Sequence, residues 1–148
     1  MKNTVKFVAV CVAAPVVALA VGTASTAWAA PTMSGHYIET DTAPSTGQTT
    51  TMDWYFTPCG DGCASAAHAP NGPAQAQAKL VDGQWKMETG PDQVVCADGT
   101  KVPSALSSFT TWDPNTLAGT VQITYQVQAC GDAAGTQQTI NMQLRQAP

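Results

Sequence analysis

The cysteines carry the most specific chemistry in this chain. Cys59 and Cys63 enclose Gly-Asp-Gly in the stretch WYFTPCGDGC, and Cys96 and Cys130 stand alone further along. Thiols in such a set can hold zinc, form a redox pair or join in disulfides. Four-thiolate zinc sites usually contain two close cysteine pairs, and redox pairs usually read C-x-x-C beside a βαβ unit. A single C-x₃-C pair therefore favours disulfides, with zinc and redox chemistry as the alternatives.

The first residues have the pattern of a secretory signal peptide. Two lysines precede the apolar run Phe7–Val21, and small residues at Ala27 and Ala29 form an A-x-A cleavage pattern. A membrane-spanning helix needs about 20 apolar residues, so this run is short for an anchor. We expect residues 1–29 to be a signal peptide cut near Ala29. Residues 30–148 would then be one secreted or cell-envelope domain without a membrane span.

Removal of the leader decides the number of cysteines. The leader takes Cys11 with it and leaves an even set, as is typical of exported chains linked by disulfides. Four cysteines allow three pairings. The two glycines between Cys59 and Cys63 let the chain turn tightly, which favours this pair. Cys96–Cys130 then follows by elimination.

The charge of the domain excludes one class of partner. After residue 29 the chain keeps four basic residues and all ten acidic ones, for a net charge of −6. A chain this acidic, with no basic stripe, is repelled by phosphate backbones and by anionic lipid surfaces. We therefore expect neither nucleic acid nor an anionic membrane as a partner.

The sequence contains no recognisable catalytic set. Its two histidines are His36, at the start of an expected strand, and His68, in an alanine-rich loop. No nucleophile elbow, H-E-x-x-H, Walker or dinucleotide motif is present. Glu88 and Asp92 flank a Gly-Pro turn, and nothing in the sequence marks either as protonated. We predict a protein that is not an enzyme and needs no cofactor or metal; a hydrolase that uses a histidine stays as an alternative.

Alternation of apolar and polar residues predicts the elements that position these groups. A period of two is typical of half-buried strands. It is clearest where Val121, Ile123 and Tyr125 alternate with threonine and glutamine. The expected strands are 36–40, 52–56, 77–81, 85–89, 93–96, 107–112, 120–128 and 139–145, and the expected loops are 40–51 and 64–74.

Turn residues separate these runs. Asp82-Gly83 is a two-residue hairpin signature, and Asp113-Pro114-Asn115 predicts a further turn. Strand signals recur about every 8–12 residues, which is typical of all-β sandwiches and barrels. We predict an all-β domain of about eight antiparallel strands, in a sandwich or small barrel, stapled by two disulfides.

Two aromatic residues are candidates for ligand contact. Tyr55 is out of phase with the apolar Trp54 and Phe56 on its strand, and Trp112 lies at the mouth of a turn. Exposed rings at strand ends can stack on sugars or anchor a protein. Core packing is the alternative for both rings.

Several ordered motifs give a resemblance. The chain contains DWYFTPCGDGC, LVDGQW, VVCADGTKVP, TWDPNTLAGT, QACGD and MQLR between about Gly35 and Arg145. In this it resembles a family of small exported mycobacterial proteins, and similar segments resemble extracellular parts of some membrane-anchored serine/threonine kinases. The resemblance implies an exported β-domain whose cysteine positions match the four cysteines here. It implies no catalytic residue.

Together these observations predict an exported binding or interaction module. Its partner would be an envelope protein or a glycan, and we expect a monomer. The first alternative is a carrier that holds a small apolar ligand in a β-barrel. The second alternative is an unrecognised hydrolase.

Overall fold

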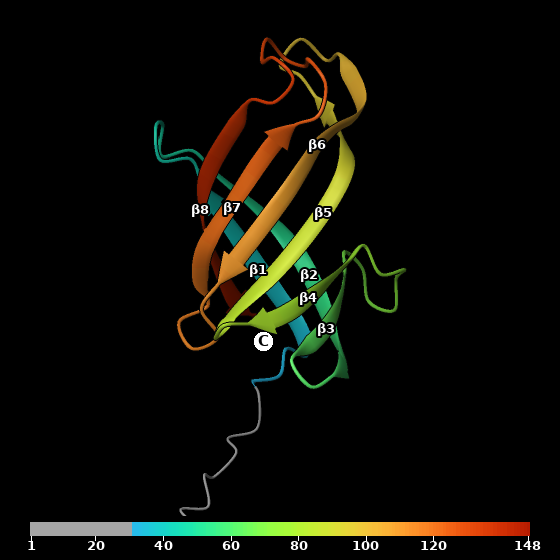
Figure 1. The fold of residues 1–148 in the computed structure, drawn as a ribbon, viewed down its shortest axis with the longest axis vertical. Coiled ribbons are helices and arrows are strands. Elements are labelled where there is room, and N and C mark those ends of the chain that lie inside the picture. Colours follow the sequence, from blue (N-terminus) through green and yellow to red (C-terminus); the bar gives the residue numbers. More distant parts are fainter. Residues whose placement is uncertain (1–30) are drawn as a thin grey trace, which may run out of the picture.

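Eight antiparallel strands close the chain into a barrel in the computed structural model, which describes residues 31–148 (Figure 1). The predicted signal peptide, residues 1–29, lies outside the described residues. Among the described residues no helix is long and apolar enough to cross a membrane. The strands are β1 (Gly35–Thr42), β2 (Thr49–Gly60), β3 (Cys63–Ala67), β4 (Ala76–Val81), β5 (Gln84–Val95), β6 (Lys101–Trp112), β7 (Ala118–Tyr125) and β8 (Gln137–Gln146).

The strand order follows the chain. Each strand pairs with the next one, and β1 pairs with β8 from Tyr37↔Gln146 to Thr42↔Asn141, which closes the barrel. The all-β prediction is confirmed, and of the two architectures left open the closed barrel is the one observed. Closure pairs both outer strands of the meander, so the sheet has no free first and last strand.

The predicted hairpin at Asp82-Gly83 is confirmed by its backbone. Asp82 has φ 54° and Gly83 has φ 77°, and a type I′ turn needs positive φ at both positions. The turn joins β4 to β5 in register, with Val81 opposite Gln84.

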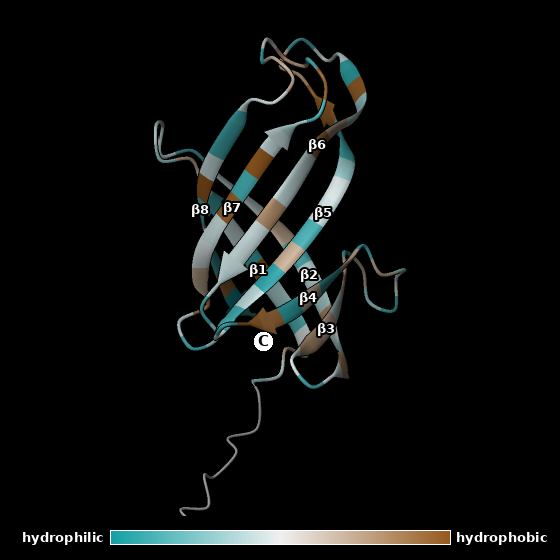
Figure 2. Ribbon diagram, in the orientation of Figure 1, coloured by the Kyte–Doolittle hydropathy of each residue, from teal (hydrophilic) through white to brown (hydrophobic). Residues whose placement is uncertain are grey.

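Large and small side chains share the core at one end of the barrel. The rings of Trp85 and Trp112 stack with centroids 6.2 Å apart, and both side chains are buried. In the same core cluster, β3 and β4 contribute the fully buried alanines Ala64, Ala66 and Ala78. Small residues leave the volume that two indoles need. Along the strands hydrophobic and hydrophilic residues are interspersed, as alternation between interior and surface requires (Figure 2).

Several predicted boundaries are wrong, although the number of strands is right; β6, for example, begins at Lys101 rather than at residue 107. Two of these errors affect the number of strands. Residues 64–67 belong to β3 rather than to a loop; this strand is built from alanine and serine and lacks the large apolar residues that usually mark one. The runs 85–89 and 93–96 are one strand, β5, because the Gly90-Pro91 turn is an irregularity within its pairing with β6. The two errors cancel in the count.

Glycine is required at one point of close approach. Gly119 of β7 pairs with Trp112 of β6, and a Cβ added to it would overlap the carbonyl oxygen of Thr111. Strands β6 and β7 therefore approach more closely here than any residue with a side chain permits.

Both predicted disulfides are present. Cys59–Cys63 ties β2 to β3 across their turn, and Cys96–Cys130 ties the tip of the β5–β6 hairpin to the loop between β7 and β8. Since all four sulfurs are paired, the zinc alternative no longer applies. Figure 1 shows the hairpin tip and this loop together at one end of the barrel. The predicted strand through residue 128 ends earlier, at Tyr125, and the following residues lead to the cross-link.

Candidate binding site inside the barrel

The barrel wall is incomplete on one side because two of its strands are short. β2 and β5 each have 12 residues, whereas β3 and β4 between them have 5 and 6. Pairing of β2 with β3 begins only at Tyr55, and pairing of β5 with β4 ends at Met87. Residues 49–54 of β2 and 88–95 of β5 therefore border a stretch of wall that neither β3 nor β4 covers.

A cavity of about 190 Å³ lies behind these unpaired edges. It lies between two apolar clusters, since Val121 of its wall belongs to the larger cluster and Leu106 packs against the smaller one around Tyr125. Its lining combines apolar, hydroxyl and acidic side chains from five strands and one loop residue. They are Glu39, Asp41, Met52, Trp54, His68, Thr89, Asp92, Leu106, Ser107, Ser108, Thr110, Val121 and Ile123.

Two carboxyl groups lie at the inner wall of this cavity. Glu39 and Asp41 are two residues apart on β1 and so point to the same, interior face. They are only 4% and 8% exposed. The indole Nε1–H of Trp54 donates a hydrogen bond of 2.6 Å to Glu39 Oε2, and the two carboxyl groups are hydrogen-bonded to each other. Asp41 Oδ1 is buried without a hydrogen-bond partner.

The surroundings decide which carboxyl holds a proton. Burial raises the pKa of Glu39 from its ordinary 4.5 to about 8, the charge and hydrogen bond of Asp41 add to this rise, and the Trp54 bond opposes it. Burial also raises the pKa of Asp41, while the hydrogen bond from Glu39 lowers it. At neutral pH the pair therefore shares one proton, held on Glu39, and one negative charge on Asp41.

Aromatic and hydroxyl groups surround the acidic pair. The ring of His68 lies on that of Trp54 with centroids 4.1 Å apart, and its Nδ1 is 3.3 Å from the carbonyl oxygen of Asp53. The hydroxyls of Thr89 and Ser108 are 2.6 Å apart and hydrogen-bonded to each other. The site thus offers a flat aromatic surface and several groups that can accept a hydrogen bond.

The acidic pair has no basic counterpart. Within residues 31–148 the ion pairs are His36–Asp53, at 2.7 Å, and Lys86–Asp82, at 3.8 Å. Neither Glu39 nor Asp41 takes part in one. In this part of the chain no three His, Cys, Asp or Glu side chains are grouped so that they could hold a metal ion.

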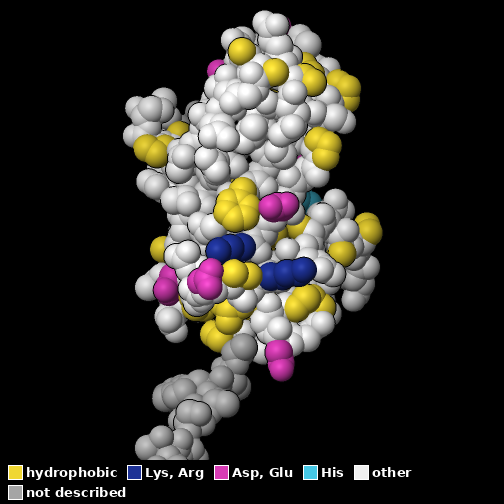
Figure 3. All heavy atoms as spheres, in the orientation of Figure 1, with side chains coloured by type: hydrophobic (Ala, Val, Ile, Leu, Met, Phe, Trp, Pro, Cys, Tyr) yellow, Lys and Arg dark blue, Asp and Glu magenta, His cyan; other side chains and the backbone are white. Residues whose placement is uncertain are grey.

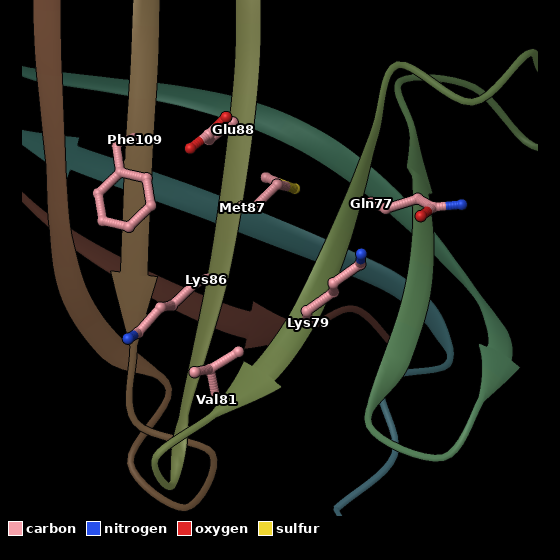
Figure 4. Close-up of a pocket in the computed structure, with 7 residues that line it drawn as sticks. All are labelled: Gln77, Lys79, Val81, Lys86, Met87, Glu88 and Phe109. Atoms are coloured by element: carbon pink, nitrogen blue, oxygen red, sulfur yellow. The ribbon is translucent and has the colours of Figure 1, made fainter.

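A second hollow lies on the outer surface of β4, β5 and β6. It has a volume of about 490 Å³ and is lined by Lys79, Lys86, Glu88 and Phe109, among others (Figure 4). Figure 3 shows basic side chains gathered on this face beside acidic and hydrophobic ones. The charged groups here lie on the barrel exterior and are largely hydrated, so none of them requires a ligand. The interior cavity is therefore the stronger candidate.

The two aromatic residues that the sequence suggested as ligand contacts point to different faces of the barrel wall. Trp112 is only 1% exposed and points into the barrel, so of the two interpretations of this ring core packing is the one observed. Tyr55 points outward and stacks on His36 with centroids 4.4 Å apart. The two rings lie on opposite faces of the barrel wall and cannot contact one small ligand together.

The two histidines also lie in different places, and so do the two acidic residues Glu88 and Asp92. His36 lies on the outer surface and pairs with Asp53, while His68 borders the cavity. Of the two acidic residues beside the Gly-Pro irregularity, Asp92 lines the cavity and Glu88 lines the outer hollow. No histidine forms a hydrogen bond to a serine or threonine hydroxyl among the described residues.

Sequence reasoning missed the acidic pair. In the run HYIETDT the apolar Ile38 suggests the interior face, which would place Glu39 and Asp41 outside. The structure has the opposite phase, with Tyr37 and the two acids inside. The only signal for this phase is that the inward Tyr37 is two residues before Glu39.

Comparison of the chain with protein-family models, with curated proteins and with solved structures finds no match.

Proposed function

We propose that this protein is an exported binding protein that holds a small molecule in the open side of its barrel. The observation that carries the proposal is the cavity of about 190 Å³ whose wall contains Asp41, buried and with one carboxylate oxygen unpartnered. Leaving such an acceptor unpaired costs about 1–3 kcal/mol, more for a charged group. A bound ligand that donates a hydrogen bond to the Asp41 carboxylate would offset part of the cost.

The mixed lining supports binding rather than catalysis. Binding pockets combine apolar walls with a few placed polar groups, as Met52, Val121 and Ile123 do here with the acidic pair and the hydroxyls. Acyl transfer by a hydroxyl needs a base beside the nucleophile. The Thr89 and Ser108 hydroxyls bond to each other, and no histidine bonds to them.

The proposal favours the interior over a surface module based on aromatic rings. A surface site needed Tyr55 and Trp112 to be exposed, and Trp112 is buried. Binding of an envelope protein or glycan through Tyr55 alone stays a second possibility, and a Tyr55→Ala variant tests it separately.

Export is part of the proposal. It is supported by the signal-like pattern of residues 1–29 and by the two disulfides, since disulfides persist in oxidising compartments. The resemblance to small exported mycobacterial proteins agrees with it.

Native mass spectrometry of protein purified from its own host tests the binding function. We expect a mass above that of the processed chain, which falls to the chain mass on denaturation. Val121→Phe fills the cavity from β7 and should abolish the added mass. The matched control, Gln122→Phe, places the same ring on the outer face of the same strand and should retain it.

Two results would contradict the proposal. The first is a native mass equal to that of the bare chain, together with no shift of the NMR resonances of the cavity residues when small fragments are added. The second is an added mass that survives Val121→Phe as well as it survives Gln122→Phe, because the ligand would then lie elsewhere.

A further inference from the structure

We propose that the ligand is a small organic cation, a protonated amine on a single-ring or short alkyl body, whose ammonium group pairs with Asp41. This inference rests on the proposed binding function and gives it a ligand class.

The charge distribution of the cavity calls for a cation. Asp41 is only 8% exposed and is among the residues that line the cavity, and its Oδ1 is buried without a hydrogen-bond partner. The neighbouring Glu39 contributes a hydrogen bond to Asp41 but no positive charge. The other ionisable groups on the lining are Asp92, which adds negative charge, and His68.

A buried charge without a counter-charge is costly, and a ligand of opposite charge removes that cost. Ammonium groups are donors only. They therefore suit the Asp41 carboxylate, whereas a carboxylate or phosphate ligand would meet like charge. The Thr89 and Ser108 hydroxyls supply further acceptors on the same wall.

The ring of Trp54 supplies a second attraction for a cation. Its indole N–H donates to Glu39, while the side chain lines the cavity and its ring lies tilted against that of His68. A cation near the face of a tryptophan is attracted by the ring quadrupole. The same indole thus holds the proton-bearing carboxyl in place and presents an aromatic wall.

The size of the cavity limits the body of the ligand. A cavity of about 150 Å³ in another protein holds benzene, and the one here has about 190 Å³. This is below the range of about 300–1,000 Å³ usual for drug-sized ligands. One ring with a short aminoalkyl group fits, with the ring against Met52, Val121 and Ile123.

A metal ion suits the site less well. Calcium takes about six to eight oxygen ligands, and here two carboxyl groups share a proton across from an apolar wall. A ligand with one charged end and one apolar end matches this division.

The test is a binding comparison of three matched probes, benzylamine, benzyl alcohol and benzoate, against the folded, disulfide-linked chain at neutral pH. Affinity is measured by calorimetry, and the site is located by the NMR resonance of the Trp54 indole N–H. We expect benzylamine to bind at least about tenfold more tightly than benzyl alcohol, and benzoate not to bind. Asp41→Asn should remove most of that preference and leave alcohol binding within about twofold. Glu88→Gln, an acid removed from the outer surface, should change neither.

The outcomes separate the two proposals. If benzyl alcohol or benzoate binds as tightly as benzylamine and shifts the Trp54 resonance, the cation is wrong while the binding function stands. If no probe binds, the results contradict both the cationic ligand and the proposal that the cavity is a binding site. If Asp41→Asn does not fold, the preference of the wild type for the amine over the alcohol decides the question alone.

Discussion

Replacing Glu39 by glutamine should make the protein more stable at neutral pH and remove most of one pH dependence of the wild type. The amide is close in shape to the protonated carboxyl. It can accept the Trp54 Nε1–H bond and donate to Asp41, so the contacts of the folded state are kept. Glutamine does not ionise, so the change removes only the titration of this side chain.

The pKa of Glu39 sets the size of the effect. In the unfolded chain this carboxyl ionises near 4.5, and in the folded barrel burial delays ionisation to about pH 8. Between these values the folded state keeps a proton that the unfolded state has lost, so raising the pH favours unfolding. The limiting slope is about 1.4 kcal/mol per pH unit. From about pH 5.5 to about pH 7.5 we expect a loss of about 2 kcal/mol, slightly below the limit because the cavity is open to water.

Urea denaturation at several pH values, followed by tryptophan fluorescence with the disulfides intact, measures this effect. Wild type and Glu39→Gln should have equal free energies of unfolding only below about pH 4.5, where Glu39 is protonated in both the folded and the unfolded chain. The variant should be the more stable by about 1 kcal/mol at about pH 5.5 and by about 3 kcal/mol at about pH 7.5. Glu88→Gln removes an exposed carboxyl on β5 and should follow the wild type throughout.

A constant difference between wild type and Glu39→Gln across this pH range would refute the reasoning. It would mean that the carboxyl ionises alike in the folded and unfolded chains and that its burial is of no energetic consequence. A variant that is less stable at every pH would show that the amide cannot replace the protonated carboxyl in its hydrogen bonds.

Three further changes test the framework around the site. Gly119→Ala should lower the free energy of unfolding by about 3 kcal/mol or prevent folding, because its Cβ would overlap the Thr111 carbonyl oxygen; a thermal unfolding midpoint equal to that of wild type would contradict this. Replacing Cys96 and Cys130 together by serine should cost about 4 kcal/mol through the larger loop that they close, and an unchanged urea midpoint would show that the cross-link constrains nothing. Trp54→Phe keeps a ring but removes the donor to the buried glutamate, so unfolding in urea should become easier by about 1 kcal/mol; equal stability would mean that water replaces the indole.

The class of fold could be predicted from local features of the sequence. Alternation in β7 and β8 depends on neighbouring residues alone, since successive side chains of a strand point to opposite faces. The Asp82-Gly83 turn needs two residues with positive φ, and those two residue types accept it. The first disulfide followed from its short loop, and the second by elimination.

The candidate site could not be predicted in the same way. β1 alternates whichever face is inside, and only its pairing with β2 and β8 turns Glu39 and Asp41 inward and Ile38 outward. A local pattern gives the period of a strand but not its phase when both faces carry plausible residues. Hydropathy alone would favour the opposite phase, because the apolar Ile38 lies outward while the two acids lie inward.

Sequence by itself therefore determined that this chain is a disulfide-linked, strand-rich domain, because turns, alternation and cysteine spacing act over a few neighbouring residues. Tertiary structure alone decided that the sheet closes, that an alanine strand shares a core cluster with the tryptophans, and that short β3 and β4 leave an open cavity over a buried acidic pair. These features depend on which strands meet across the barrel, and the energy of burying a carboxyl depends on everything that surrounds it.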